Sequence, residues 1–229
     1  MLLAFAAACG STLFPTCADV RVIAVDLAER GESRSTRNVW TIEEFGRDVA
    51  AVLEAESIET AVVAGRSLGG AVAVEVGRQL PDKVSQVVAL DALHYLGLFP
   101  AQSAEQVEAM ENLFRQDFEG GVRGLVEGGS PAGTDEALKD AYFEKMVAVR
   151  QPAGLHSIEG LVHWDMDAAL SETKQPITVF AIRDLTDQEA IERYGDRIDI
   201  VLVDLGSHHF QVEAPEGTAR LLAGVVGSK

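Results

Sequence analysis

A serine in a tight glycine turn is the first residue of this sequence that could do chemistry. The segment Gly65-Arg66-Ser67-Leu68-Gly69 follows small and branched apolar residues at 61–64 and precedes an Ala/Val-rich run without proline. This is G-x-S-x-G between a buried strand and a helix, a context that lifts a serine hydroxyl above the end of a sheet. The N-terminus of the following helix favours a developing negative charge. The sequence therefore predicts that Ser67 is a nucleophile.

A serine hydroxyl is a poor nucleophile at neutral pH, so it needs a neutral imidazole to take its proton. A carboxylate must in turn hold that imidazole and stabilise its charged form. Two adjacent histidines, His208 and His209, follow the last predicted strand. Candidate acids follow two other predicted strands: Asp91 comes after 84–90, and Asp184 and Asp187 come after 177–182. A Ser-His-Asp set is therefore available in the sequence.

The predicted elements that must position these residues alternate between strands and helices. Buried strands are expected at 2–8, 20–25, 60–64, 84–90, 177–182 and 198–203. Helices are expected at 42–56, 68–80, 188–194 and 215–226. Between 92 and 175 we find only helical patterns, at 103–118, 121–127, 135–150 and 155–164. Alternating strands and helices predict an α/β protein with a parallel sheet covered on both faces.

Together these motifs resemble the α/β-hydrolase family, over most of the chain. Asp26…Gly31-Glu32-Ser33 resembles the family's D-x-x-G-x-G-x-S loop, and the Ser67 turn resembles its nucleophile motif. Residues 208–216 resemble its C-terminal H-x-x-x-x-E-x-P-E segment. The resemblance implies a three-layer α/β-hydrolase fold with a mostly parallel sheet, its N-terminal strands trimmed, and a helical cap. It implies core segments at 1–92 and 176–229 and a cap at 93–175.

The resemblance also ranks the histidines and the acids. His208 is favoured over His209 as the base, because its spacing to Glu213 matches the family pattern. Most family members place the acid after the strand that corresponds to 177–182, which favours Asp184. Some lipases of this fold carry the acid where Asp91 stands, so Asp91 is the second candidate and Asp187 the third.

Two backbone amides are expected to hold the oxyanion of the tetrahedral intermediate. One is the amide of Leu68, directly after the nucleophile. The family's second donor follows a His-Gly dipeptide, which corresponds here to Cys9-Gly10 and makes the amide of Ser11 the candidate.

A serine at this turn points to acyl transfer through an acyl-enzyme rather than to the alkyl esters that family members with aspartate there form. We therefore expect a serine hydrolase that cleaves a small, fairly apolar carboxylic ester, lactone or thioester. Two alternatives stay open. One is a ligand-binding or signalling protein of the same fold with little turnover. The other is a carbon–carbon bond hydrolase, since those enzymes also use a serine.

Composition limits the partners. The 229-residue chain has a formal net charge of −17, which disfavours binding to nucleic acid or to anionic lipid. Cys9 and Cys17 fit no zinc spacing, and the sequence shows no phosphate loop, so neither a metal nor a cofactor is expected. No apolar run is long enough to span a membrane. We expect a cytoplasmic protein that binds a small acyl substrate; its oligomeric state is left open.

Overall fold

A computed structural model describes residues 2–5 and 21–227 of the chain. Six strands form one sheet in the order β2-β1-β3-β4-β5-β6, and every neighbouring pair is parallel. The strands are β1 (Leu2–Phe5), β2 (Val22–Ala24), β3 (Ala61–Arg66), β4 (Val84–Leu90), β5 (Ile177–Ile182) and β6 (Asp199–Val203). The parallel sheet expected from the sequence is confirmed, and β4 and β5 have the predicted bounds.

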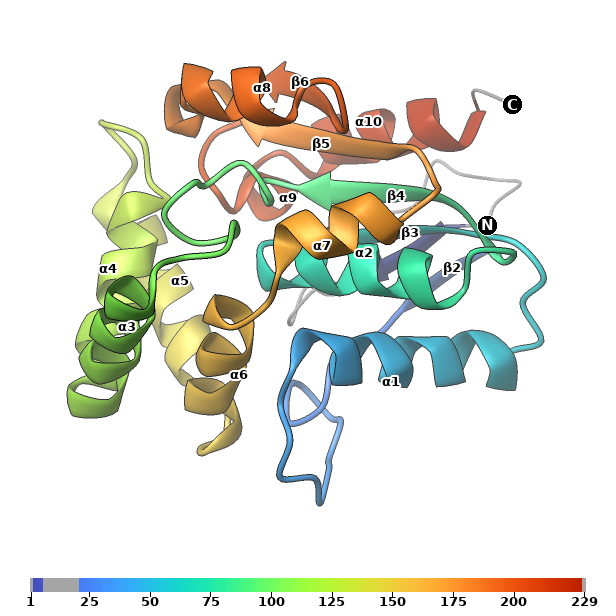
Figure 1. Cartoon of the computed structure of the whole chain (residues 1–229). Coiled ribbons are helices and arrows are strands. Elements are labelled where there is room, and N and C mark those ends of the chain that lie inside the picture. The colour runs from blue at the N-terminus through green and yellow to red at the C-terminus, as the bar shows by residue number, and fades with distance from the viewer. Residues whose placement is uncertain (1, 6–20, 228–229) are drawn as a thin grey trace.

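Parallel strands bring the residues that follow each strand to one edge of the sheet. Ser67 follows β3, Asp91 follows β4, and the loop that carries His208 follows β6. In Figure 1 the arrowheads of β4 and β5 point toward the helices α3, α4, α5 and α6, so this edge of the sheet faces that helical group.

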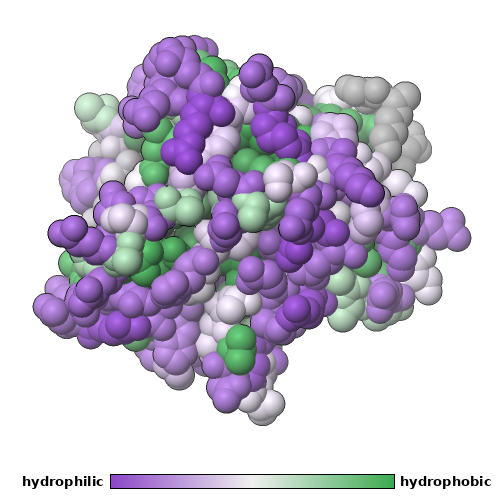
Figure 2. Space-filling view, viewed as in Figure 1, coloured by the Kyte–Doolittle hydropathy of each residue, from purple (hydrophilic) through white to green (hydrophobic). Residues whose placement is uncertain are grey.

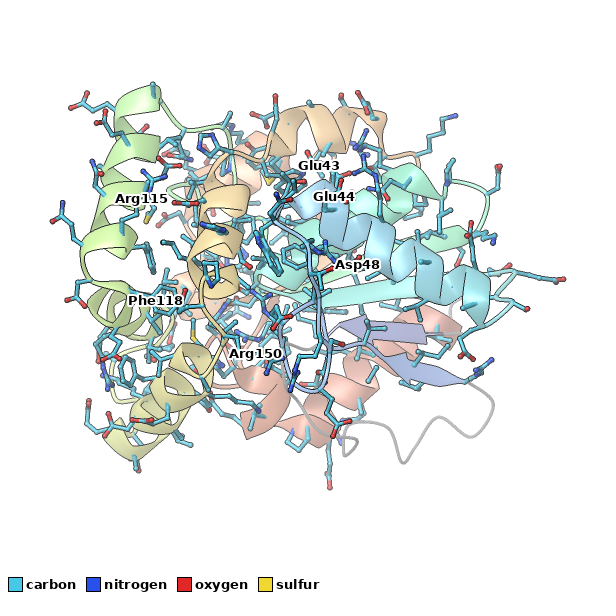
Figure 3. The ribbon with its side chains drawn as sticks, turned by 90° about the horizontal axis from the view of Figure 1, so that it is seen from below. Glu43, Glu44, Asp48, Arg115, Phe118 and Arg150 are labelled. Carbon is cyan, nitrogen blue, oxygen red and sulfur yellow. The ribbon has the colours of Figure 1, made fainter. Side chains whose placement is uncertain are left out.

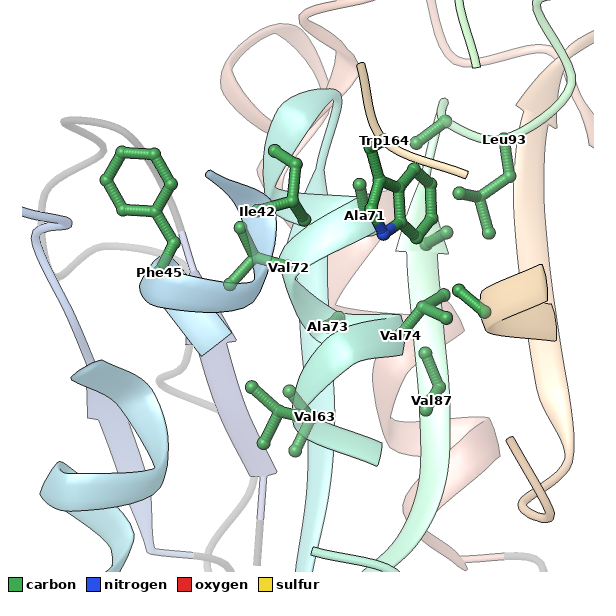
Figure 4. Close-up of a cluster of buried hydrophobic side chains, with 14 of the residues drawn as sticks. Ile42, Phe45, Val63, Ala71, Val72, Ala73, Val74, Val87, Leu93 and Trp164 are labelled. Atoms are coloured by element: carbon green, nitrogen blue, oxygen red, sulfur yellow. The ribbon is translucent and has the colours of Figure 1, made fainter. Parts of the chain in front are cut away.

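Two separate apolar clusters cover the two faces of the sheet, because successive side chains of a strand point to opposite faces. On β3, Val63 faces one cluster, whereas Val62 and Ala64 face the other. The first cluster includes side chains of α1 (Ile42–Ala55), α2 (Leu68–Gln79), α7 (Met166–Glu172) and α8 (Gln188–Tyr194); Figure 4 shows its packing around α2. The second includes α9 (Phe210–Glu213) and α10 (Pro215–Gly227). The molecule is therefore a three-layer α/β/α fold.

The segment between β4 and β5 consists of helices joined by loops. It contains α3 (Ala104–Gln116), α4 (Phe118–Gly128), α5 (Glu136–Val147), α6 (Ala153–Val162) and α7. All of 92–175 is described, and no strand occurs in it. A division of the chain at 93 and 175 into core and cap stays a prediction.

Each predicted helix in this segment shifts by a few residues at one or both ends, and two of the differences have a clear structural cause. The predicted helix 103–118 ends at Gln116, because the side chain of Asp117 accepts a hydrogen bond from the Gly120 amide (2.8 Å) and begins α4 there. The helix α7 was missed; Asp165 caps it by accepting from the Ala168 amide at 2.9 Å. Both starts use an aspartate N-cap.

An arginine clasp, made by Arg150, joins the connection between α5 and α6 to the loop between β2 and α1. Arg150 donates to the Glu29 carboxylate (2.6 Å) and to the Ser33 carbonyl (2.7 Å), and Figure 3 shows Arg150 beside this loop. The loop is closed on itself, because the Ser33 hydroxyl donates to the Asp26 carbonyl at 2.7 Å. At Gly31 φ is +49°, and a Cβ would lie 1.9 Å from the Asp26 carboxylate. These contacts explain the D-x-x-G-x-G-x-S-like spacing.

Most of the surface visible in Figure 2 is hydrophilic, in keeping with the 36 acidic and 19 basic residues of the chain. Within the part of the chain that the structure describes, no helix has both the length and the apolar character needed to cross a bilayer.

Candidate active site

Ser67 has a backbone conformation that residues other than glycine rarely adopt. Its φ and ψ are 53° and −127°, at the junction of β3 and α2. Such strain persists only where surrounding contacts hold the residue in place, and it is frequent at active sites. Here the Ser67 amide donates to the Leu90 carbonyl (3.3 Å), and the Gly70 amide donates to the Ser67 carbonyl (2.7 Å). The turn between β3 and α2 is therefore a sharp elbow that presents one serine.

Close packing explains the glycines around this serine. A Cβ on Gly65 would lie 1.9 Å from the Gly69 carbonyl oxygen, and a Cβ on Gly70 would lie 2.5 Å from the Cβ of Ala92. Neither distance is sterically allowed, so strand and helix approach this closely only with glycine at both positions. The first glycine of the G-x-S-x-G motif, and Gly70 directly after the motif, are thus packing requirements of the elbow.

His208 is paired with Asp91 at the same edge of the sheet. The distance from His208 Nδ1 to Asp91 Oδ2 is 2.7 Å, and the Asp91 side chain is fully buried. An ionised carboxylate only accepts hydrogen bonds, so Nδ1 carries the proton and Nε2 is left as the basic nitrogen. The pair has the arrangement that orients an imidazole for proton transfer.

The pKa values of both partners are held low. Burial and the nearby Arg66 charge lower the pKa of His208, although Asp91 opposes this effect. Burial disfavours the ionised form of Asp91, but contacts with His208, His94 and the Ile182 amide hold its pKa below the usual value. At neutral pH His208 is therefore neutral, as a general base requires, and Asp91 is ionised.

Asp91 takes the position for which the family resemblance favours Asp184. Asp184 lies in the short 3-10 helix Arg183–Leu185, and both Asp184 and Asp187 are exposed. At the end of β5, the Ile182 amide donates to Oδ1 of the buried Asp91 at 2.7 Å. The geometry thus supports the second-ranked candidate, Asp91, as the partner of His208.

His209, the alternative base, is engaged elsewhere. Its ring stacks on Tyr142 with centroids 3.8 Å apart and planes inclined by 13°. Only 5% of the residue is exposed, and burial with the Arg66 charge lowers its pKa far below the usual value. The geometry therefore favours His208 as the base and gives His209 a packing position.

Glu213 fastens the loop that carries His208. Its carboxylate accepts from the Ser207 amide (3.2 Å), from the Ser207 hydroxyl and from the Tyr142 hydroxyl (2.9 Å). Gly206 has a φ of +110°, and a Cβ there would lie 2.2 Å from this carboxylate. The spacing between His208 and Glu213 in the C-terminal motif thus has a structural cause.

The two oxyanion candidates differ in what the structure describes. Leu68 is the first residue of α2, and amides in the first turn of a helix are not used inside it. Ser11, with Cys9 and Gly10, lies outside the described residues. Within the described residues, no group of three or more His, Cys, Asp or Glu side chains is arranged to hold a metal ion.

Two residues of this site gave no sequence signal. Tyr95 donates its hydroxyl to Asp91 Oδ2, and the Gly129 carbonyl accepts from the His208 amide at 2.8 Å. Both lie in the segment between β4 and β5. A tyrosine four residues after a strand and a glycine after a helix are common features, so only the folded contacts distinguish them.

Comparison with known proteins agrees with this architecture. The chain belongs to the alpha/beta hydrolase family, whose family model matches residues 3–221. A protein of Mycobacterium phage D29 with a provisional name, non-heme haloperoxidase, is 39% identical over 72 residues, which are 31% of this chain and 26% of that protein. The chain thus matches about a quarter of that relative's length.

Solved structures match nearly the whole chain. Est816, described as an N-acyl homoserine lactone degrading enzyme, aligns over 97% of this chain and 92% of its own, with a TM-score of 0.78 and 22% identity. A thermophilic esterase from Thermogutta terrifontis aligns over 98% of this chain and 88% of its own, with a TM-score of 0.79 and 18% identity. These similarities confirm the α/β-hydrolase fold.

Proposed function

We propose that this protein is a serine hydrolase that cleaves a small, fairly apolar carboxylic ester, lactone or thioester through an acyl-enzyme on Ser67. The observation that carries the proposal is the buried Asp91–His208 pair, which lies at the same edge of the parallel sheet as the strained Ser67 elbow. Arg66 directly precedes Ser67, and its charge lowers the pKa of His208, in keeping with the nearness of the Arg66 and His208 side chains.

In the proposed reaction His208 Nε2 takes the hydroxyl proton as Ser67 Oγ attacks the carbonyl carbon. The resulting oxyanion accepts a hydrogen bond from the Leu68 amide and, if the family pattern holds, from the Ser11 amide. His208 then gives its proton to the leaving alcohol or thiol, and the acyl group stays on Ser67. Water repeats the sequence and releases the acid. Asp91 stabilises the imidazolium at each transfer.

Substrate class is argued from the nucleophile and from two similar structures. A serine nucleophile forms an ester intermediate that water hydrolyses, which suits carboxylic esters, lactones and thioesters. The similar structures are named as a lactone-degrading enzyme and an esterase. We propose that helices α3 to α6 supply the apolar side chains that receive the acyl group.

Covalent labelling tests the nucleophile and the base together. We expect a fluorophosphonate probe to label the wild-type protein rapidly, and Ser67→Ala not at all. His208→Ala should label at least about 100-fold more slowly, because the serine has lost its base. Hydrolysis of p-nitrophenyl acetate and butyrate should fall in the same order. Full hydrolytic activity of folded Ser67→Ala would contradict the proposal. Folded wild type that neither labels nor turns over would favour the ligand-binding alternative.

A further inference from the structure

More groups face the carboxylate of Asp91 than a Ser-His-Asp triad needs. Oδ2 accepts from His208 Nδ1 at 2.7 Å and also from the Tyr95 hydroxyl. Oδ1 accepts from the Ile182 amide at 2.7 Å and lies 3.4 Å from His94 Nε2. One oxygen thus serves two side-chain donors, and the other is fixed by the backbone.

The backbone after β4 brings Tyr95 back to this carboxylate. Asp91 and Leu93 have φ angles of 47° and 72°, in a region that non-glycine residues seldom occupy. The Tyr95 ring packs on His94, with centroids 4.2 Å apart, and lies edge-on to His208 at 5.8 Å. The strained turn from Asp91 to Tyr95 therefore carries both the acid and a side chain that donates a hydrogen bond to it.

We propose that Tyr95 is a positioning residue for the hydrolytic reaction, acting through the oxygen of Asp91 that holds His208. With Tyr95 and His208 on Oδ2 and the Ile182 amide on Oδ1, the carboxylate is held against rotation. The tyrosine hydroxyl also draws part of the negative charge that would otherwise stabilise the imidazolium. Tyr95 thereby sets both the direction and the basicity of His208. This proposal rests on the proposed function.

Tyr95 is suited to remain a donor throughout the working pH range. Burial, followed by the Asp91 charge, raises its pKa far above the usual value. The hydroxyl therefore keeps its proton, and its hydrogen bond to the ionised carboxylate persists.

His94 does not supply an equivalent donor. Its Nδ1 lies 3.2 Å from the Ala92 carbonyl, which only accepts, so Nδ1 carries the proton of the neutral ring. The bare Nε2 then faces Asp91 Oδ1. Burial lowers the pKa of His94, against the opposing charges of Asp91 and Asp187, and keeps this form. Tyr95 is thus the side chain that shares Asp91 with His208.

Several groups influence the pKa of His208, so the substitution used as a test must leave all of them in place except the Tyr95 hydroxyl. Asp91 and Arg66 act on it directly, His94 lies behind Asp91, and the rings of Tyr95 and His209 flank it at 5.8 and 5.4 Å. Tyr95→Phe removes one O–H group and keeps the ring against His94 and His208. It therefore isolates the hydrogen bond.

We expect Tyr95→Phe to lower kcat for p-nitrophenyl butyrate about tenfold with KM changed less than about twofold, because the Asp91 carboxylate can then rotate and no longer fixes the direction of His208. The acid limb of the kcat/KM profile should move to higher pH. The sign follows because an unshared Asp91 carboxylate stabilises protonated His208 more strongly and raises its pKa. Tyr194→Phe is the matched control: this buried tyrosine donates to Asp167 at 2.8 Å, between α8 and α7, and should change neither quantity.

A second readout separates this proposal from the proposed function. The pKa of His208 is measured by NMR titration of histidine-labelled wild type and Tyr95→Phe, without any substrate. A higher His208 pKa in Tyr95→Phe supports the proposal even if the wild type cleaves no ester. An unchanged pKa, or a loss of activity equal at every pH and matched by a lower Tm, would overturn it. Failure of hydrolysis in wild type would instead count against the proposed function alone.

Discussion

Asp91 has a φ of 47° and is fully buried, two features that are costly for an aspartate unless its surroundings require them. Its two oxygens receive hydrogen bonds from His208, Tyr95 and the Ile182 amide. At the scale of single residues, the proposed chemistry therefore depends on how this one carboxylate is held. Asp184, by contrast, is exposed in the turn after β5.

Paired asparagine substitutions distinguish the two acids. We expect Asp91→Asn to lower kcat for ester hydrolysis about 10³-fold or more, because an amide neither enforces the tautomer of His208 nor stabilises its charged form. Asp184→Asn should retain kcat within about twofold. The measurement is steady-state hydrolysis of one ester by both variants, with circular dichroism to establish folding. A larger loss in Asp184→Asn would place the acid after β5 instead, and equal losses would contradict the assignment to Asp91 alone.

At the scale of elements, the loop after β6 carries His208 between two supports. Glu213 of α9 holds the loop from one side, and the Gly129 carbonyl at the end of α4 accepts from the His208 amide at 2.8 Å. A helix between β4 and β5 therefore touches the base directly. A Cβ at Gly129 would lie 2.8 Å from the His208 Cβ, a contact that requires either the end of α4 or the His208 loop to shift.

Alanine substitutions at two adjacent glycines test this support. We expect Gly129→Ala to lower kcat roughly ten- to a hundredfold, since displacement of a catalytic group by a fraction of an ångström is enough for such a loss. Gly128→Ala is the control, because a Cβ there meets nothing within 4 Å and alanine suits a helix better than glycine. Steady-state kinetics and melting temperatures are compared for the two. Unchanged kcat in Gly129→Ala would mean that α4 yields without disturbing His208.

The elements themselves were largely predictable, whereas the partner of His208 was not. β5 is a fully buried apolar run, and β4 is buried at Val84 and from Val87 to Leu90, so their limits follow largely from composition. Asp91 and Asp184 each follow one of two adjacent parallel strands, and the family resemblance ranks Asp184 first, whereas the structure pairs His208 with Asp91. The choice of Asp91 over Asp184 depends on a left-handed backbone conformation at Asp91. This conformation is rare outside glycine and cannot be predicted from the residue type. The contacts of Tyr95 and Gly129 could not be predicted from the sequence either, because they form only when the segments around β4 and β6 meet in the folded protein.

At the scale of the whole molecule, the segment between β4 and β5 must stay fixed on the sheet to keep Gly129 and Tyr95 in place. One link is made by Arg150, which donates to Glu29 and to the Ser33 carbonyl in the loop after β2. The Glu29 pKa lies below its usual value because of its hydrogen bond with Arg150. Partly exposed ion pairs add little to global stability, so the effect of this clasp is expected to be local.

Hydrogen exchange measures that local effect. We expect Arg150→Ala to speed amide exchange in peptides covering 26–35 at least about threefold, while Tm falls by no more than about 3 °C, because the clasp orders the loop without contributing much to the core. Arg123→Ala is the matched control: its ion pair with Asp140 (2.8 Å) links α4 to α5 and does not reach the loop, so exchange at 26–35 should be unchanged. If neither variant speeds exchange there, the loop is held by its internal contacts through Asp26 and Ser33 and the clasp is dispensable; if both do, the effect is not specific to the clasp.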